Sequence, residues 1–220
     1  MNERIAGKEK IAEYFEGLFE KYGDDYRSLE WKSKESQTVR FSVLLDIVSF
    51  VEEHKQISIL DVGCGLGHFY DFLKTSGMLD ALKITYCGID ISKKLIDFAK
   101  TKHNGIDFRV VDVINDKFSE EFDYVMSSGA FNIKMTDLSS HKETIVKMLT
   151  RMYSISRLGM AVNFLSRVAM YLIPEERNEE KEKFVYFTEE EVTSWVKAIG
   201  NRYILRRDYH PGDFTVYMLK

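Results

Sequence analysis

The chain has few of the residues that define disulfide-bonded proteins, and it has no long hydrophobic run. Two cysteines and two prolines occur among 220 residues, which supports neither a disulfide framework nor a zinc site and is typical of a reducing compartment. The apolar run Val168–Ile173 is far shorter than the roughly 20 residues that span a bilayer. Met1–Lys10 is charged and lacks the apolar core of a signal peptide. We therefore expect a cytoplasmic protein without a membrane partner.

Positive charge is not in excess either. The chain has 31 Lys and Arg residues against 35 Asp and Glu residues, a formal net charge of -4. Proteins that bind nucleic acids draw much of their affinity from clustered Lys and Arg, so we expect no nucleic-acid partner. What is present, 45% hydrophobic and 30% charged residues, is the composition of an ordinary folded protein, and the length suits a single domain.

Short apolar runs alternate with amphipathic stretches through the middle of the chain. The runs that predict strands are Ile57–Val62, Ile84–Ile89, Phe108–Val113, Phe122–Met126 and Met160–Leu165. The stretches that predict helices are Phe69–Leu73, Lys93–Lys102 and Lys142–Tyr153. This alternation is the βαβ signature, and crossovers between parallel strands are almost always right-handed. We therefore predict an α/β fold, a doubly wound, mostly parallel, Rossmann-like sheet with helices on both faces.

The C-terminal part has a different pattern. Thr188 and Glu191 form a capping-box sequence that predicts a helix reaching Ile199. Tyr203–Tyr209 and Phe214–Leu219 follow, separated by turn residues, and predict a hairpin that makes one strand antiparallel. These two strands bring the predicted sheet to seven.

The N-terminal residues 1–55 are predicted to be helical at Glu9–Tyr22 and Thr38–Glu53. They form either a lid over a site or a plain cover for the sheet, as helices do in most α/β domains. Residues 56–220 then make up the core of what is a single domain overall. The mixed-charge segment Glu175–Lys183 is expected to be a solvated loop between the fifth predicted strand and the last predicted helix.

A glycine-rich turn follows the first predicted strand. Asp61 is the last residue but one of this strand, and Gly63, Cys64, Gly65 and Gly67 come after it. Glycine allows a tight turn and a close approach of the main chain to a ligand. The spacing Gly-x-Gly-x-Gly places a histidine, His68, where the dinucleotide pattern requires glycine. The turn therefore predicts a ligand other than a nicotinamide cofactor. Cys64 has no cysteine nearby in the sequence, so its small size rather than redox chemistry explains it.

Carboxylates end the next two predicted strands. Asp90 closes the second run and can accept hydrogen bonds from both hydroxyls of a ribose. Asp112 lies in the third run, where its side chain or the neighbouring amide could contact an adenine ring. The glycine turn, Asp90 and Asp112 thus lie at the ends of three successive predicted strands. They predict one nucleoside-binding site at the carboxyl ends of these strands.

With these motifs in place, the chain resembles the class I S-adenosylmethionine-dependent methyltransferases. Asp61–Gly67 is similar to the first motif of that family, and Phe122–Asn132 is similar to the fourth. The resemblance implies S-adenosyl-L-methionine as cofactor and S-adenosyl-L-homocysteine as product. It implies that the glycine turn contacts the methionine part and that the fourth motif passes beneath the sulfonium. The implied cofactor-binding set is Asp61, Gly63, Cys64, Gly65, Gly67, Asp90, Ile91, Asp112, Val113 and Ser127, to which position alone adds Arg40, beside Gln37, as a partner for the cofactor carboxylate.

The fourth motif also excludes some reactions. The adenine-N6 and glutamine methyltransferases of this class have an Asn-Pro-Pro-Tyr type sequence where this chain has Ser127-Ser128-Gly129-Ala130. The magnesium-dependent catechol enzymes have clustered acids, for which only Asp112, Asp123 and Asp137 are candidates by sequence position. We predict no metal.

Methyl transfer from a sulfonium requires alignment of the nucleophile and exclusion of water. If the acceptor is a hydroxyl, a histidine is the usual group to take its proton. His141, in a predicted loop after the fourth motif, is preferred to His68 and His210. The predicted substrate pocket consists of Tyr14, Tyr22, Tyr26, Trp31 and Asn132.

The resulting interpretation is a methyltransferase that acts on an oxygen or nitrogen of a small-molecule methyl acceptor, such as a metabolite, a sugar or a natural-product precursor, and works as a monomer or homodimer. Two alternatives stay open at this point. One is methylation of a protein or RNA, and the other is a catalytically silent subunit that binds the cofactor and has a regulatory role.

Overall fold

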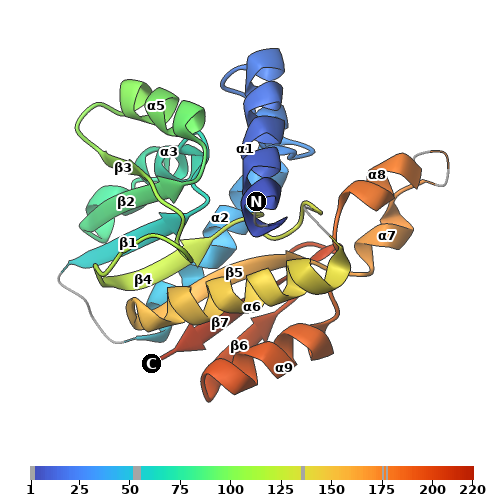
Figure 1. The fold of residues 1–220 in the computed structure, drawn as a ribbon. Coiled ribbons are helices and arrows are strands. Elements are labelled where there is room, and N and C mark those ends of the chain that lie inside the picture. The colour runs from blue at the N-terminus through green and yellow to red at the C-terminus, as the bar shows by residue number, and fades with distance from the viewer. Residues whose placement is uncertain (1–2, 52–55, 135–136, 175, 177) are drawn as a thin grey trace.

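The computed structural model describes residues 3–51, 56–134, 137–174, 176 and 178–220. Within these residues the chain forms one seven-stranded sheet with the strand order β3-β2-β1-β4-β5-β7-β6 (Figure 1). Strand β7 is antiparallel to both of its neighbours, and the other pairings are parallel. The strands are β1 (Ile57–Val62), β2 (Ile84–Asp90), β3 (Asp107–Val110), β4 (Phe122–Ser127), β5 (Ser156–Leu165), β6 (Arg202–Arg206) and β7 (Asp213–Leu219). The predicted fold class is confirmed.

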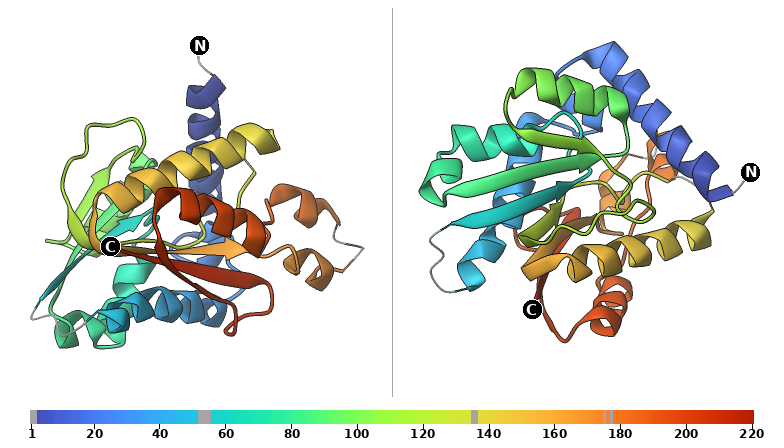
Figure 2. Two further views of the ribbon diagram at one scale, coloured as in Figure 1. Left: turned by 90° about the horizontal axis from the view of Figure 1, so that it is seen from below. Right: turned by 60° about the vertical axis from the view of Figure 1, so that its left-hand side comes forward.

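Helices cover both faces of the sheet (Figure 2). Successive residues of a strand point to opposite faces, so Ile57 and Ile59 of β1 pack in one hydrophobic cluster and Leu60 and Val62 in the other. Helices α2, α3 and α5 contribute to the first cluster, and α6 and α9 to the second. The α-helices are α1 (Glu3–Tyr22), α2 (Lys34–Leu45), α3 (His68–Thr75), α4 (Met78–Ala81), α5 (Lys93–Lys102), α6 (Leu138–Ser154), α7 (Ala169–Leu172), α8 (Asn178–Lys183) and α9 (Glu189–Ile199), and the 3-10 helices are η1 (Tyr26–Leu29) and η2 (Asp46–Phe50).

Several predicted boundaries were wrong. Helix α1 and strand β5 begin earlier than predicted and strand β6 ends earlier, and three further differences concern β3, α6 and α2. Strand β3 ends at Val110 because the Asp112 side chain accepts hydrogen bonds from the following amides and starts a turn. Helix α6 begins at Leu138 because the Asp137 side chain caps it, and the segment predicted as a loop is therefore helical. Helix α2 begins after its cap Ser33 and ends at Leu45. The predicted helix end at Glu53 and the boundary at residue 55 lie outside the described residues.

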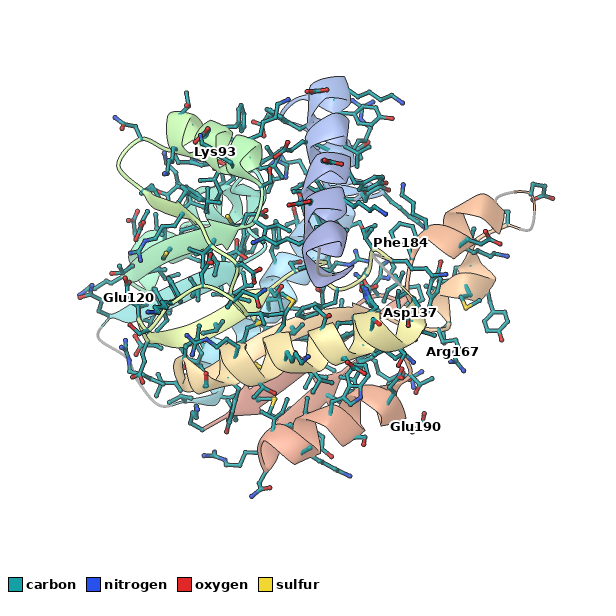
Figure 3. All side chains as sticks on the ribbon, in the orientation of Figure 1. Lys93, Glu120, Asp137, Arg167, Phe184 and Glu190 are labelled. Carbon is teal, nitrogen blue, oxygen red and sulfur yellow. The ribbon has the colours of Figure 1, made fainter. Side chains whose placement is uncertain are left out.

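Helix α1 lies across the carboxyl ends of the strands rather than on a face of the sheet (Figures 1 and 2). A second segment, between β5 and α9, projects from the same side and contains α7 and α8 (Figure 1). Bridges between Ser166 and Phe187 and between Ile133 and Phe184 attach the base of this segment to the end of β5 and to the loop after β4. Figure 3 shows Phe184 at that base. We call residues 166–187 the arm. Contrary to the prediction of a loop, part of it is helix α8; Glu175 and Arg177 lie outside the described residues.

No helix within the described residues has the length and apolar character needed to cross a membrane.

Candidate functional site

The glycine turn after β1 has the geometry of a ligand-binding turn. Gly63, Gly65 and Gly67 have φ angles of 77°, 53° and 79°, a region that residues with a Cβ rarely occupy. The amides of Gly63 and Cys64 donate to the Ile89 carbonyl at 2.8 and 3.1 Å and so tie the turn to the end of β2. The turn leads directly into α3, for which Gly67 is the N-cap residue.

Asp90 joins the glycine turn to the start of α5. One carboxylate oxygen accepts from the Gly65 amide at 2.9 Å and the other from the Ser92 amide at 2.9 Å. Burial raises the pKa of Asp90, although these hydrogen bonds act in the opposite direction. Each oxygen of a carboxylate has two acceptor sites, so Asp90 retains the capacity to accept from ligand hydroxyls. Together with the neighbouring turn, the residues present fit the sugar of a nucleoside cofactor. Ile91 is half-buried between Asp90 and Ser92.

Asp61 lies beneath the turn and faces the interior. It is 3% exposed, and it accepts a hydrogen bond from the Tyr86 hydroxyl at 2.7 Å. Burial raises its pKa to about 7, against a lowering contribution from Tyr86. The structure thus pairs this predicted cofactor residue with Tyr86 of β2, and its direct contact with a cofactor stays a prediction.

The raised pKa of Asp61 predicts a pH-dependent gain in stability for Asp61→Asn, which keeps an oxygen for Tyr86. The ordinary pKa is 3.8 and the folded value is about 7, so the folded state holds its proton where the unfolded chain has released it. The contribution of Asp61 to stability therefore falls as pH rises between these values and stays low above pH 7. The melting temperature of the variant minus that of the wild type should increase from pH 5 to pH 8. A difference that is constant over this range would contradict the assignment.

Asp112 follows β3 and is also buried, at 7% exposure. Its carboxylate accepts from the Ile114 amide at 3.0 Å and from the Asn115 side chain at 2.8 Å, and it pairs with Lys8 of α1 at 3.0 Å. The next residue, Val113, is 4% exposed. The glycine turn, Asp90 and Asp112 therefore lie along one edge of the sheet, as the sequence predicts.

The loop after β4 touches the glycine turn. A Cβ placed on Gly63 would lie 3.0 Å from the Cβ of Ala130. The Ser127 hydroxyl donates to the Val62 carbonyl at 2.8 Å. The Gly129 amide donates to the buried side chain of Asn163 on β5 at 2.8 Å. The loop is thus held on both sides, and Asn163 is a residue that sequence reasoning missed.

Asn132 ends this loop, and its side-chain oxygen accepts from the Leu165 amide at 3.1 Å. Its own carbonyl accepts from the Val185 amide of the arm at 2.7 Å. Asn132 therefore connects the loop to β5 and to the arm, and its place in a substrate pocket stays a prediction.

The end of η1 and the residues after it cover the glycine turn and the loop after β4. A Cβ on Gly65 would lie 2.9 Å from the Leu29 side chain, and a Cβ on Gly129 would lie 3.1 Å from the Trp31 ring. Glu30, between them, has a φ of 60°, which is uncommon for a residue other than glycine. Backbone strain of this kind gathers at functional sites. No sequence signal pointed to Leu29 or Glu30.

Glu30 is the centre of a small polar cluster that joins three elements. Its carboxylate accepts from the Tyr14 hydroxyl of α1 and pairs with Lys183 of the arm. Lys183 also lies over the Tyr14 ring, 5.2 Å from its centroid. Burial and then the Glu30 hydrogen bond raise the pKa of Tyr14. Of the predicted pocket residues, Tyr14 and Trp31 thus flank Glu30.

The remaining aromatic residues of the predicted pocket, Tyr22 and Tyr26, contact Arg27 through their rings. The Arg27 guanidinium lies over the rings of Tyr22 and Tyr26, at 4.9 and 5.9 Å from their centroids.

His141 lies in the first turn of α6 and is 1% exposed. Its Nε2 atom is 2.9 Å from the Phe131 carbonyl, and within the described residues Nδ1 has no hydrogen-bond partner. Burial lowers its pKa. A general-base role would require an acceptor to reach this buried ring, and it stays a prediction.

The other two candidate histidines, His68 and His210, hold elements together. His68 lies 3.0 Å from an Asp24 oxygen and 3.1 Å from the Gln37 side chain. His210 lies 3.4 Å from Asp213, and burial followed by the Arg40 charge lowers its pKa to about 4.

Arg40 is buried at 6% exposure and forms an ion pair with Asp213 at the start of β7. It also donates to the Ser36 carbonyl at 2.7 Å and lies 5.0 Å from the centroid of the Trp31 ring. These partners connect α2 to the hairpin, and pairing with a cofactor carboxylate stays a prediction.

The three acids considered for a metal have separate partners. Asp123 accepts from Ser58 and pairs with Arg157, Asp137 caps α6, and Asp112 pairs with Lys8. In the part of the chain that the structure describes, no group of three or more His, Cys, Asp or Glu residues could hold a metal ion.

Comparisons with known proteins identify similar sequences among methyltransferases. Residues 59–155 match the model of a family described as a methyltransferase domain. The chain is 32% identical over 116 residues to "Putative methyltransferase Rv1506c" from Mycobacterium tuberculosis, a match that covers 50% of this chain and 63% of that protein. It is 31% identical over 70 residues to "Putative methyltransferase 235L" from Invertebrate iridescent virus 6, which covers 32% of this chain and 25% of the viral protein. The chain thus matches less than two thirds of the length of either relative.

Solved structures share the fold over nearly the whole chain. The magnesium protoporphyrin IX methyltransferase from Synechocystis, with bound S-adenosylhomocysteine, has a TM-score of 0.62 at 15% identity and covers 97% of this chain and 99% of that one. The plantazolicin methyltransferase, in complex with a desmethyl analogue and S-adenosylhomocysteine, has a TM-score of 0.67 at 16% identity, with coverages of 97% and 99%.

A sheet with this strand order, with a glycine turn after β1 and carboxylates after β2 and β3, has the Rossmann-like fold of methyltransferases. Residues 59–155 thus match a methyltransferase-domain family, and the whole chain shares its fold with solved methyltransferases. The Synechocystis enzyme has been solved with bound S-adenosylhomocysteine and with bound S-adenosylmethionine.

Proposed function

We propose that the protein transfers the methyl group of S-adenosylmethionine to an oxygen or nitrogen of a small-molecule acceptor. The observation that carries this proposal is the fixed pair formed by the Gly65 amide and the Asp90 carboxylate, 2.9 Å apart. The pair sets a ligand-binding turn against a sugar-binding acid at one edge of the sheet. Bound there, the cofactor supplies an electrophilic methyl group on a positively charged sulfur.

The protein's own part in this reaction is alignment and exclusion of water. The loop after β4 would support the reacting end of the cofactor, because Ala130 packs against Gly63 and Asn163 holds Gly129. An acceptor would approach from the side of Trp31 and the Tyr14–Glu30–Lys183 cluster, where α1, the η1 segment and the arm meet. An approach bounded by three elements favours a small molecule over a folded macromolecule.

We also infer separate roles for the two parts of residues 1–55. Helix α1 and η1 act as a lid, since they lie over the strand ends and the glycine turn. Helix α2 belongs to the core, since Phe41 and Leu44 are buried in one of its two hydrophobic clusters.

The proposal is tested by incubating the protein with S-adenosylmethionine and pools of small hydroxyl and amine compounds, and measuring S-adenosylhomocysteine release. Release that depends on one pool, with a product heavier by one methyl group, is the expected result. Cofactor binding without release from any small-molecule pool would contradict it. Release with RNA or protein as the acceptor would instead favour macromolecular methylation.

A further inference from the structure

Helix α1 contacts the sheet edge through two charged side chains. The Glu16 carboxylate accepts from the Ser92 hydroxyl at 2.6 Å, and the Lys8 ammonium pairs with Asp112 at 3.0 Å. Farther along the same helix, Glu20 pairs with Lys94 on α5. Helix α1 is therefore attached both to the residues that follow β2 and β3 and to a helix behind them.

A nucleoside in the proposed site would extend toward the same place. In the strand order β3-β2-β1, the glycine turn follows β1, Asp90 ends β2 and Asp112 follows β3. The Val111 amide donates to the Asp90 carbonyl at 3.0 Å, so the last two positions adjoin. Suppose that Asp90 holds the sugar and that the methionine part of the cofactor runs along the turn after β1. The base of the cofactor must then lie on the β3 side, beside Asp112.

The acceptor sites of the Asp112 carboxylate are already in use. One oxygen accepts from the Ile114 and Asn115 amides at 3.0 and 3.2 Å. The other accepts from the Asn115 side chain at 2.8 Å and contacts Lys8 at 3.0 Å. A carboxylate oxygen has two acceptor sites, so the exocyclic amine of an adenine can bond to Asp112 only by replacing one of these donors.

Lys8 is the donor that can leave. The main-chain amides of Ile114 and Asn115 belong to the same tight turn as Asp112 and cannot withdraw without unfolding it, and the Asn115 side chain is attached to that turn. Lys8 comes from α1, and its side chain is 39% exposed against 9% for that of Asp112. Water can solvate the released ammonium, whereas the carboxylate needs a replacement partner.

We propose that Lys8 competes with the base of the cofactor for Asp112, so that α1 carries a built-in inhibitor of cofactor uptake. The inference rests on the proposed function, because it assumes that a nucleoside binds at this edge. A protein that must first break an internal contact has a lower apparent affinity, in proportion to the fraction of molecules in which the contact is open. Salt weakens exposed ion pairs, so ionic strength would regulate cofactor uptake.

The test is calorimetric titration of Lys8→Met with S-adenosylhomocysteine at low salt. Methionine has a similar length but neither charge nor hydrogen-bond donor. We expect the dissociation constant to be about two- to fivefold lower than in the wild type, the range for removal of a partly exposed ion pair. As sodium chloride is raised, the wild-type affinity should approach that of the variant.

Glu20→Gln is the matched control, because it removes an ion pair of α1 that does not involve Asp112. It should leave the dissociation constant unchanged, and an equal gain in both variants would overturn the proposal, since loosening of α1 would then explain it. A second probe, S-inosylhomocysteine, has a carbonyl in place of the amine. The gain from Lys8→Met should disappear with this probe.

The outcomes separate this inference from the proposed function. Wild-type protein that binds S-adenosylhomocysteine, with a variant that binds equally or more weakly, overturns only the role of Lys8. Failure of both proteins to bind at millimolar ligand overturns both proposals. Binding by the variant alone would support both.

Discussion

Asp90→Ala is expected to weaken the binding of S-adenosylhomocysteine by at least about 100-fold, because two hydrogen bonds from sugar hydroxyls to a charged group are lost. The same substitution removes the acceptor of the Gly65 amide, so the glycine turn also loses its tie to α5. Both effects lower the affinity for S-adenosylhomocysteine. Calorimetric titration of the purified variant measures the loss directly.

Two further variants make this result interpretable. Asp90→Asn keeps the size of the side chain and one acceptor oxygen, and it should bind more tightly than the alanine variant but less tightly than the wild type. Asp97→Ala removes an exposed acid from the outer side of α5, where it pairs with Lys93, and it should bind like the wild type. A folded Asp90→Ala protein with an affinity within about tenfold of the wild type would refute the role of Asp90.

The parts of the fold that could be predicted are those specified by neighbouring residues. Strand β1 and helix α5 have the predicted bounds, because an apolar run and a Ser92 cap determine them locally. Helix α9 begins after Thr188, whose side chain accepts from the Glu191 amide at 3.2 Å as a capping sequence requires. Asp90 and Asp112 could be placed near each other from the sequence, because parallel strands have their carboxyl ends at the same side of the sheet.

The boundary of α6 could also have been read correctly. Asp137 is a favourable N-cap residue, and its side chain accepts from the Ser139 and Ser140 amides at 3.0 and 3.1 Å. This signal would have placed His141 in a helix. A buried histidine in a packed helix is less accessible to a substrate than one in an exposed loop.

The contacts between distant segments could not be predicted. Lys8 reaches Asp112 across 104 positions of sequence, and Lys183 reaches Glu30 across 153. Their pairing depends on how α1 and the arm pack on the sheet edge, which no local pattern encodes. Glu30 gives no signal in the sequence either, because it takes the left-handed conformation that ends η1, a position at which glycine is the usual residue.

Asn163→Leu is expected to damage both stability and cofactor binding, because it removes the acceptor of the Gly129 amide while keeping a similar side-chain volume. An unpaired amide in a partly buried loop costs about 1 to 3 kcal/mol, which corresponds to a melting temperature lower by roughly 2 to 12 °C in a domain of this size. The loop contacts the glycine turn through Ala130 and Gly63. Its displacement should therefore weaken S-adenosylhomocysteine binding by about tenfold, or roughly 1.4 kcal/mol.

Asn132→Leu separates loop position from loss of stability. Asn132 accepts from the Leu165 amide, on the side of the loop that faces the arm rather than the glycine turn. The substitution should lower the melting temperature by a similar amount, measured by calorimetry, and change the affinity for S-adenosylhomocysteine by less than about threefold. If both variants lose affinity in proportion to their loss of stability, the effect is general loosening. If only Asn163→Leu loses affinity, β5 sets the position of the cofactor through one buried amide side chain.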